Sequence, residues 1–152
     1  MTVGLRGPRG GYLRELAGHW LRGFDWRQQE DALNRFSHFR ADVNGFGVHF
    51  IHERGQGDRP LPIVLTHGYP DSFVRFLKII PMLTDPAAHG GDAADAFDVV
   101  VPSLPGYGFS DKPTAKGFTF RIGNLWHHLM TETLGYRRFA AHGGDRTVWL
   151  PG

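Results

Sequence analysis

Apolar residues recur at helical spacing near the start of the chain. A first helix is predicted over residues 12–21 because four apolar residues repeat every three or four positions: Leu13, Leu16, Trp20 and Leu21. Gly23 is expected to end it. A second helix is predicted from the N-cap Asp25, with Gln28 at the capping-box position and an apolar side formed by Trp26, Leu33 and Phe36. Helices this short need a further surface to cover.

The period of the pattern changes to two from Phe46 to Glu53, which predicts an edge-like strand. Three short apolar runs follow at 63–66, 97–101 and 139–141, and such runs are typical of strands covered on both faces. Helices are expected between them: one capped by Ser72 that Pro81 kinks or ends, and one within 117–135 stopped by Gly135. The alternation predicts an α/β fold with a mostly parallel sheet, flanking helices and right-handed crossovers.

Composition narrows the class of protein. The 152 residues are 41% hydrophobic and include 12 Phe and 4 Trp, enough to fill the core of one domain. A net charge of +2 is too small to indicate nucleic-acid binding. The absence of cysteine excludes disulfides and thiolate chemistry. No stretch approaches the roughly 18 apolar residues of a membrane span, so we expect a cytoplasmic protein.

The most suggestive stretch for chemistry is Gly143-Gly144-Asp145-Arg146-Thr147. A small residue two places before a nucleophile and another two places after it is the pattern of a nucleophile elbow, a turn too sharp for bulky neighbours. The carboxylate of Asp145 at its tip could attack carbon and form an ester. The alternative interpretation is a plain Gly-Gly-Asp turn.

Two further motifs follow apolar runs. The run 62–66 ends at His67-Gly68-Tyr69-Pro70, and the run 97–101 is followed by Pro105-Gly106-Tyr107-Gly108-Phe109-Ser110. The second motif lacks the Gly-Lys-Ser/Thr of a phosphate-binding loop, which argues against a nucleotide site. Together with the elbow, this order resembles the α/β-hydrolase superfamily, in particular epoxide hydrolases of the microsomal type, from about Tyr12 to Asp145.

The resemblance implies roles for these residues. Asp145 would be the nucleophile, and the backbone N–H groups of Tyr69 and Arg146 would form the oxyanion hole. Supporting motif residues would be His67, Gly68, Pro70, Gly143 and Gly144, with a cis bond between Tyr69 and Pro70. The substrate would be a small-molecule epoxide opened to a vicinal diol, a role in epoxide metabolism and detoxification that needs no cofactor.

Histidines and acidic residues elsewhere do not predict a metal site. His127 and His128 are adjacent, so on a helix they point about 100° apart and do not share a metal. A metal bound by Asp92, Asp95 and Asp98 is less expected than a solvated loop. His67 and His142 flank strands, and we expect them to bond buried backbone groups.

The resemblance also defines two segments and a departure. Residues 1–44 would be a partial N-terminal helical segment of an epoxide hydrolase, and residues 45–152 a partial α/β-hydrolase domain ending just after the elbow. Arg146 and Thr147 replace the Trp and Gly that usually follow the family's nucleophile, and none of the nine histidines follows Asp145. We therefore expect a truncated or frame-shifted product, without the cap, acid partner and histidine base, in which ester hydrolysis would stall.

Two alternatives stay open. One is a haloalkane dehalogenase-like hydrolase, which would use the same nucleophile. The other is a non-catalytic fragment that binds a partner chain. The sequence does not indicate an oligomeric state.

Overall fold

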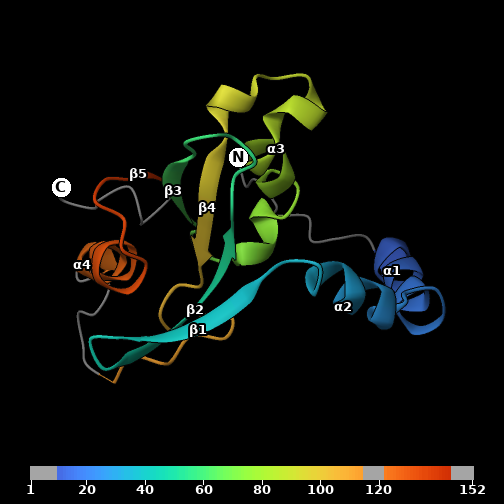
Figure 1. Cartoon of the computed structure of the whole chain (residues 1–152). Helices are drawn as coiled ribbons and strands as arrows, with labels where there is room; N and C mark the ends of the chain where they lie inside the picture. Colours follow the sequence, from blue (N-terminus) through green and yellow to red (C-terminus); the bar gives the residue numbers. More distant parts are fainter. Residues whose placement is uncertain (1–9, 115–121, 145–152) are drawn as a thin grey trace, which may run out of the picture. The chain divides into compact units, whose positions relative to one another are not determined.

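The computed structural model describes residues 10–114 and 122–144 (Figure 1). The chain divides into two compact units, Met1–Ala32 and Leu33–Gly152. The first unit contains α1 (Gly10–Arg22) and all but the last residue of α2 (Trp26–Leu33). Both predicted helix signals are confirmed, because the N–H of Gly23 closes α1 on the carbonyl of His19 and Asp25 Oδ1 accepts the N–H of Gln28 at 3.2 Å.

The second unit is built on a five-stranded sheet with the order β1-β2-β4-β3-β5 (Figure 1). The strands are β1 (His38–Val43), β2 (Phe46–Glu53), β3 (Leu61–Thr66), β4 (Phe97–Pro102) and β5 (Ala140–Gly143). Strands β4, β3 and β5 run parallel, whereas β2 is antiparallel to both β1 and β4. The predicted α/β class and the parallel core of the sheet are confirmed.

Two strand predictions need correction. The segment 38–43 was not predicted as a strand, yet it forms β1 at the edge of the sheet. Consequently β2 is not an edge strand: it lies between β1 and β4, and its four central residues, Val48–Ile51, are all buried. The predicted second helix also ends early, because the N–H of Phe36 bonds the carbonyl of Leu33 and the chain turns toward β1. The proposed segment boundary at residue 44 stays a prediction.

Hydrophobic residues pack on both faces of the sheet, as the alternation of side chains along strands requires. On one face Val48, Phe50, Val64 and Val100 pack against α4 (Ile122–His128) and the π-helix η5 (Leu129–Thr133). On the other face lie Ile51, Leu65, Val99 and Val101, with Phe73 and Ile80 from the segments after β3. Figure 1 shows α4 and α3 on opposite sides of the sheet.

The segment after β3 is broken into short pieces: η1 (Phe73–Phe76), α3 (Ile80–Thr84), η2 (Pro86–His89) and η3 (Ala93–Asp95). Ser72 caps η1 as predicted, because its Oγ accepts the N–H of Val74 at 3.3 Å. Pro81 does not end a helix but lies in the first turn of α3. N–H groups in the first turn have no partner within the helix, so the missing N–H of Pro81 costs no helical hydrogen bond. Gly135, with φ of +76°, follows η5 and confirms the predicted stop. None of the helices in the described ranges is long and apolar enough to span a membrane.

Candidate active site

The three parallel strands end on one side of the sheet, which we call the carboxyl side. In the register of β3 and β5, Thr66 lies beside Gly143, and in that of β3 and β4, Val64 lies beside Val100. The turn after β3, the loop after β4 and the turn after β5 therefore leave the sheet together, where open α/β sheets bind ligands. Gly143 ends β5 and Gly144 follows it half-buried, whereas Asp145 and Arg146 lie outside the described residues.

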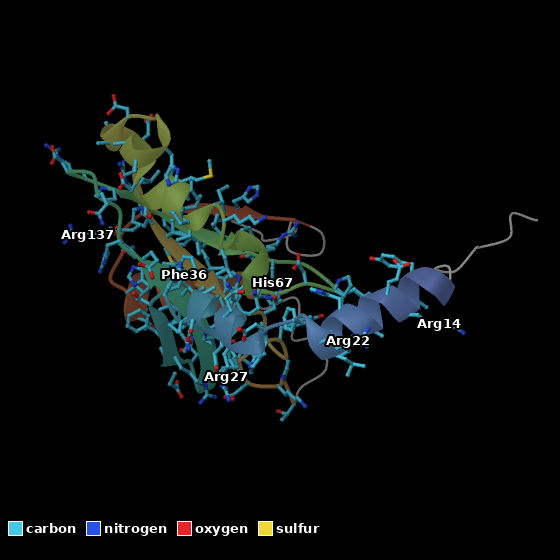
Figure 2. The ribbon with its side chains drawn as sticks, turned by 90° about the vertical axis from the view of Figure 1, so that its right-hand side faces the viewer. Arg14, Arg22, Arg27, Phe36, His67 and Arg137 are labelled. Carbon is cyan, nitrogen blue, oxygen red and sulfur yellow. The ribbon has the colours of Figure 1, made fainter. Side chains whose placement is uncertain are left out.

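His67 joins the turn after β3 to the loop after β4. Figure 2 marks its position in the structure. Its ring is fully buried, and its Nε2 accepts the N–H of Leu104 at 3.1 Å. Its Nδ1 lies 3.1 Å from the carbonyl oxygen of Gly68, which can only accept, so the proton resides on Nδ1. Burial lowers the pKa of His67, which keeps the ring neutral near pH 7. The prediction that His67 bonds buried backbone groups is confirmed.

The turn that follows His67 has the expected cis bond between Tyr69 and Pro70. Gly68 is buried, whereas the side chain of Tyr69 is 68% exposed. Asp71 fixes the end of the turn, because its carboxylate accepts the N–H of Ser72 at 2.8 Å and pairs with Arg75 at 2.9 Å. The pairing of the Tyr69 and Arg146 amides as an oxyanion hole stays a prediction, since Arg146 lies outside the described residues.

A partly buried polar cluster that was not predicted lies at the start of the loop after β4. We call it the His–Ser cluster, and its members are His38, His49, Ser103 and Ser110. His49 Nδ1 lies 2.8 Å from Ser103 Oγ, and its Nε2 lies 2.9 Å from His38 Nδ1. Burial, followed by the neighbouring His38, lowers the pKa of His49 from 6.5 to about 4. The sequence signal for this cluster was His49, a polar residue between the apolar Val48 and Phe50 of β2.

His142 departs from expectation, and two buried polar groups stand out as well. His142 is exposed, so the prediction that it bonds buried backbone is wrong. The hydroxyl of Thr66, at the end of β3, and the indole N–H of Trp126 are buried without a hydrogen-bond partner among residues 10–114 and 122–144.

A second polar cluster lies on the opposite side, where β3 and β4 begin. The hydroxyl of Tyr136 donates to Asp98 at 2.7 Å and lies 2.9 Å from His52 Nε2 and 2.6 Å from Arg54. Burial raises the pKa of Asp98, but hydrogen bonds from Gly55, Tyr136 and Arg54 outweigh it and lower that pKa overall. Burial and the Asp98 carboxylate together raise the pKa of Tyr136.

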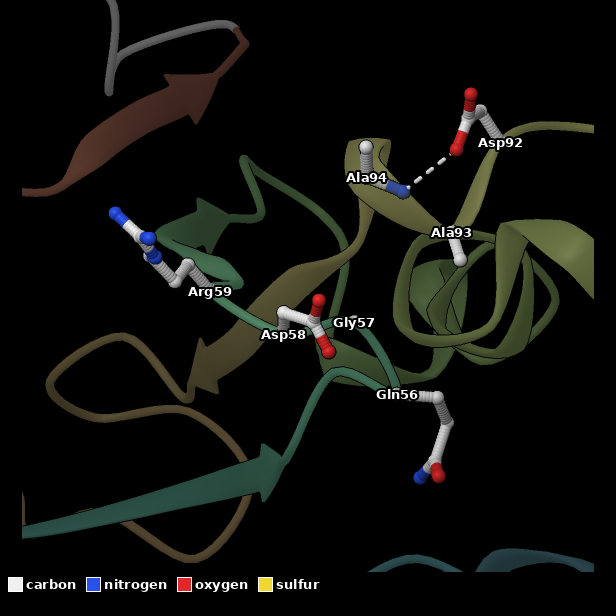
Figure 3. A pocket seen from close by; sticks show the side chains of 7 residues that line it. All are labelled: Gln56, Gly57, Asp58, Arg59, Asp92, Ala93 and Ala94. Carbon is white, nitrogen blue, oxygen red and sulfur yellow. Dashed lines mark hydrogen bonds between the residues drawn. The ribbon is translucent and has the colours of Figure 1, made fainter.

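An open pocket of about 370 Å³ also lies on this opposite side (Figure 3). It is lined by the segment 56–59 before β3 and by Asp92, Ala93 and Ala94 before β4. The Oδ1 of Asp92 is engaged by the N–H of Ala94 at 2.9 Å. The pocket is therefore separate from the carboxyl side. Across the described residues, no group of three or more His, Cys, Asp or Glu is arranged to hold a metal.

Known proteins match this chain over both units. The model of the epoxide hydrolase N terminus matches residues 3–76, and that of the alpha/beta hydrolase fold matches residues 62–146. A putative epoxide hydrolase of Stigmatella aurantiaca is 53% identical over 88% of this chain and 30% of its own length. Epoxide hydrolase 1 of Oryctolagus cuniculus is 40% identical over the same shares.

A solved structure agrees with the sequence matches. The epoxide hydrolase of Aspergillus niger superposes with a TM-score of 0.79 and 30% identity, covering 95% of this chain and 37% of that one. The chain thus spans about 30% of the length of the curated relatives it matches. The second family match covers more than half of the chain and contains the three strand-end motifs in their expected order. The chain belongs to the α/β-hydrolase family, and the relatives that it matches are epoxide hydrolases.

Proposed function

We propose that the protein opens a small-molecule epoxide by attack of the Asp145 carboxylate on an epoxide carbon. A bond forms between a carboxylate oxygen and that carbon, the carbon–oxygen bond of the ring breaks, and the ring oxygen leaves as an alkoxide that takes a proton from water. The product is a hydroxyalkyl ester of Asp145. In a second step, water attacks the ester carbonyl and releases the diol.

One observation supports this proposal most directly: Thr66 of β3 lies beside Gly143 of β5. Residues 68–70 lie two to four positions after Thr66, and Asp145 lies two positions after Gly143. The segment that carries the predicted oxyanion donor and the segment that carries the predicted nucleophile therefore leave the sheet from neighbouring residues. The Tyr69 and Arg146 amides would face the charge that develops on the carboxylate oxygen, and each such donor can contribute roughly 3–4 kcal/mol.

The test is to incubate the 152-residue protein with styrene oxide and to map covalent adducts by peptide mass spectrometry. We expect one hydroxyalkyl ester, on Asp145, which is absent in Asp145→Ala. Asp58→Ala is the matched control, because Asp58 is an exposed carboxylate before β3, on the side of the sheet away from the proposed site, and its loss should leave the adduct unchanged. Adducts spread over several carboxylates, or persisting in Asp145→Ala, would contradict the proposal.

The same incubation distinguishes the other predictions. Accumulation of the ester without diol would support the prediction that hydrolysis stalls in this polypeptide, whereas diol formed by it would refute that prediction. Halide release from a haloalkane without reaction of epoxides would favour the dehalogenase alternative. Location in the cytoplasm stays a prediction, which fractionation of cells expressing the protein would test.

A further inference from the structure

The loop from Ser103 to Asp111 is fastened at both ends to β2. The N–H of Ser103 donates to the carbonyl of His49 at 2.8 Å, and the N–H of Asp111 donates to the carbonyl of Gly47 at 2.8 Å. The N–H of His49 in turn donates to Ser110 Oγ at 3.0 Å. The short segment 47–49 therefore sets where the loop after β4 begins and ends.

The hydrogen bonds of the His–Ser cluster have one consistent direction while both rings are neutral. His38 Nε2 lies 3.0 Å from the carbonyl of Leu33, which only accepts, so His38 carries its proton on Nε2. Its Nδ1 must then accept from His49 Nε2, and His49 Nδ1 accepts from the hydroxyl of Ser103. Ser110 Oγ donates to the carbonyl of Ser103 at 2.8 Å. Each ring nitrogen has one partner, so both rings are held in a single orientation.

Packing fixes the same residues sterically. His49 is 4% exposed, stacks on His38 at a centroid distance of 5.2 Å, and meets the rings of Phe73 and Phe109 edge-on at 5.1 Å each. Ser103 is fully buried, and a side-chain carbon at Gly108 would lie only 2.6 Å from Ser103 Oγ. A buried polar network of this kind is stable only when every member is satisfied, and it then favours one arrangement of the loop.

This arrangement continues to the turn that carries the predicted oxyanion donor. Leu104, the residue after Ser103, donates its N–H to His67 Nε2. The Nδ1–H of the same ring contacts the carbonyl of Gly68, the residue before Tyr69. A continuous path of bonded groups therefore runs from His38 through Ser103 and His67 to the peptide unit that ends in the Tyr69 amide.

We propose that His38 and His49 are positioning residues of this site. By holding Ser103, they fix the neighbouring Leu104 amide, which fixes the His67 ring. The His67 ring in turn holds the Gly68–Tyr69 peptide in place. The effect on chemistry rests on the proposed function, but the effect on the position of the turn does not. Substitutions in the His–Ser cluster, which lies beside β2 and β4, should thus perturb residues 68 and 69 after the neighbouring strand β3.

Amide NMR of the ¹⁵N-labelled protein tests this directly. We expect Ser103→Ala and His49→Phe to shift the Gly68 and Tyr69 signals and to speed hydrogen exchange of the Leu104 amide about tenfold, with the Val64 and Val100 amides unchanged. In His38→Asn the side-chain oxygen can still accept from His49, so these signals should stay close to the wild type.

Tyr136→Phe is the matched control, because it removes a buried hydroxyl from the cluster on the opposite side of the sheet. It should leave the Gly68, Tyr69 and Leu104 signals in place. Unchanged signals in Ser103→Ala, or exchange accelerated equally in the strands, would overturn the positioning role. Ser103→Ala decides the matter if His49→Phe does not fold.

The rate of ester formation at Asp145 is measured on the same proteins. A decrease of about tenfold in Ser103→Ala, with no decrease in Tyr136→Phe, is expected if the turn acts in the reaction. If no protein forms the ester, the wild type included, the proposed function fails while the NMR result still decides the positioning role. Ester formation at the wild-type rate in Ser103→Ala, despite shifted signals, would refute the catalytic consequence.

Discussion

His49 should make the folded protein sensitive to acid. Its folded-state pKa of about 4 lies below its ordinary value of 6.5, because burial and then the nearby His38 oppose a charge on the ring. At pH 7 the residue is neutral in both the folded and the unfolded chain and contributes little to the pH dependence. Between pH 6.5 and 4 the unfolded chain binds a proton there that the folded chain does not, so the free energy of unfolding falls as the pH falls.

The size of the effect follows from the two pKa values. Proton binding with pKa values of 6.5 in the unfolded chain and about 4 in the folded chain gives a loss of about 2 kcal/mol on going from pH 7 to pH 4.5. His52 and His67 also have pKa values lowered by burial and act in the same direction, so the wild type alone does not isolate His49. The difference between the wild type and His49→Phe does isolate it, because phenylalanine keeps an aromatic ring but does not titrate.

Urea unfolding followed by tryptophan fluorescence at pH 7 and pH 4.5 provides the measurement. We expect His49→Phe to be less stable than the wild type at pH 7, where it has lost two hydrogen bonds, but to lose about 2 kcal/mol less on acidification. His89→Phe is the control, since His89 is exposed on η2. Equal pH dependence in the wild type and His49→Phe, within about 0.5 kcal/mol, would refute the reasoning.

Three further substitutions test the packing by urea unfolding at pH 7. Tyr136→Phe removes the hydroxyl shared by Asp98 and His52 and should cost about 1–3 kcal/mol; a cost near zero would show that the cluster contributes nothing. Thr66→Val replaces a buried hydroxyl without a partner and should stabilise by about 1 kcal/mol, whereas a loss of stability would show that the hydroxyl is bonded. Gly57→Ala would place a carbon 2.4 Å from the carbonyl oxygen of Ala93 and should cost about 1–3 kcal/mol; an unchanged midpoint would contradict the close contact.

Local sequence patterns predicted those features whose causes are local. The apolar runs at 63–66 and 97–101 are β3 and β4, because strands covered on both faces need apolar residues at every position. The caps at Asp25 and Ser72 are confirmed because each depends on a side chain and an N–H two or three residues away. The order of the strand-end motifs also predicted that the turns after β3, β4 and β5 leave one side of a parallel sheet, whereas the role of Asp145 there stays a prediction.

Features that depend on distant partners were missed. The segment 38–43 alternates polar and apolar residues, as a strand does. It was missed because Leu33 and Phe36 are at helical spacing, which favoured a helix that continues to residue 36. The alternation from Phe46 to Glu53 predicted an edge-like strand, and only the pairing with β1 shows that β2 has a neighbour on both sides. The His–Ser cluster joins residues 38, 49, 103 and 110, which only the register of β1, β2 and β4 brings together. No local pattern encodes that register.

The two polar clusters at the ends of the sheet differ in charge, and the difference suits the proposed chemistry. On the side away from the site, the cluster contains the Arg54–Asp98 ion pair, so the Asp98 carboxylate is held by a positive charge. On the carboxyl side, burial lowers the pKa values of His49 and His67, so these two buried imidazoles are neutral near pH 7, and the ion pairs Asp71–Arg75 and Arg40–Asp111 are more exposed to solvent. A buried cation beside the elbow would pair with the Asp145 carboxylate and weaken it as a nucleophile. Neutral imidazoles fix the backbone by hydrogen bonds alone, so the two histidines would hold the loops without adding a cation that could pair with the predicted nucleophile.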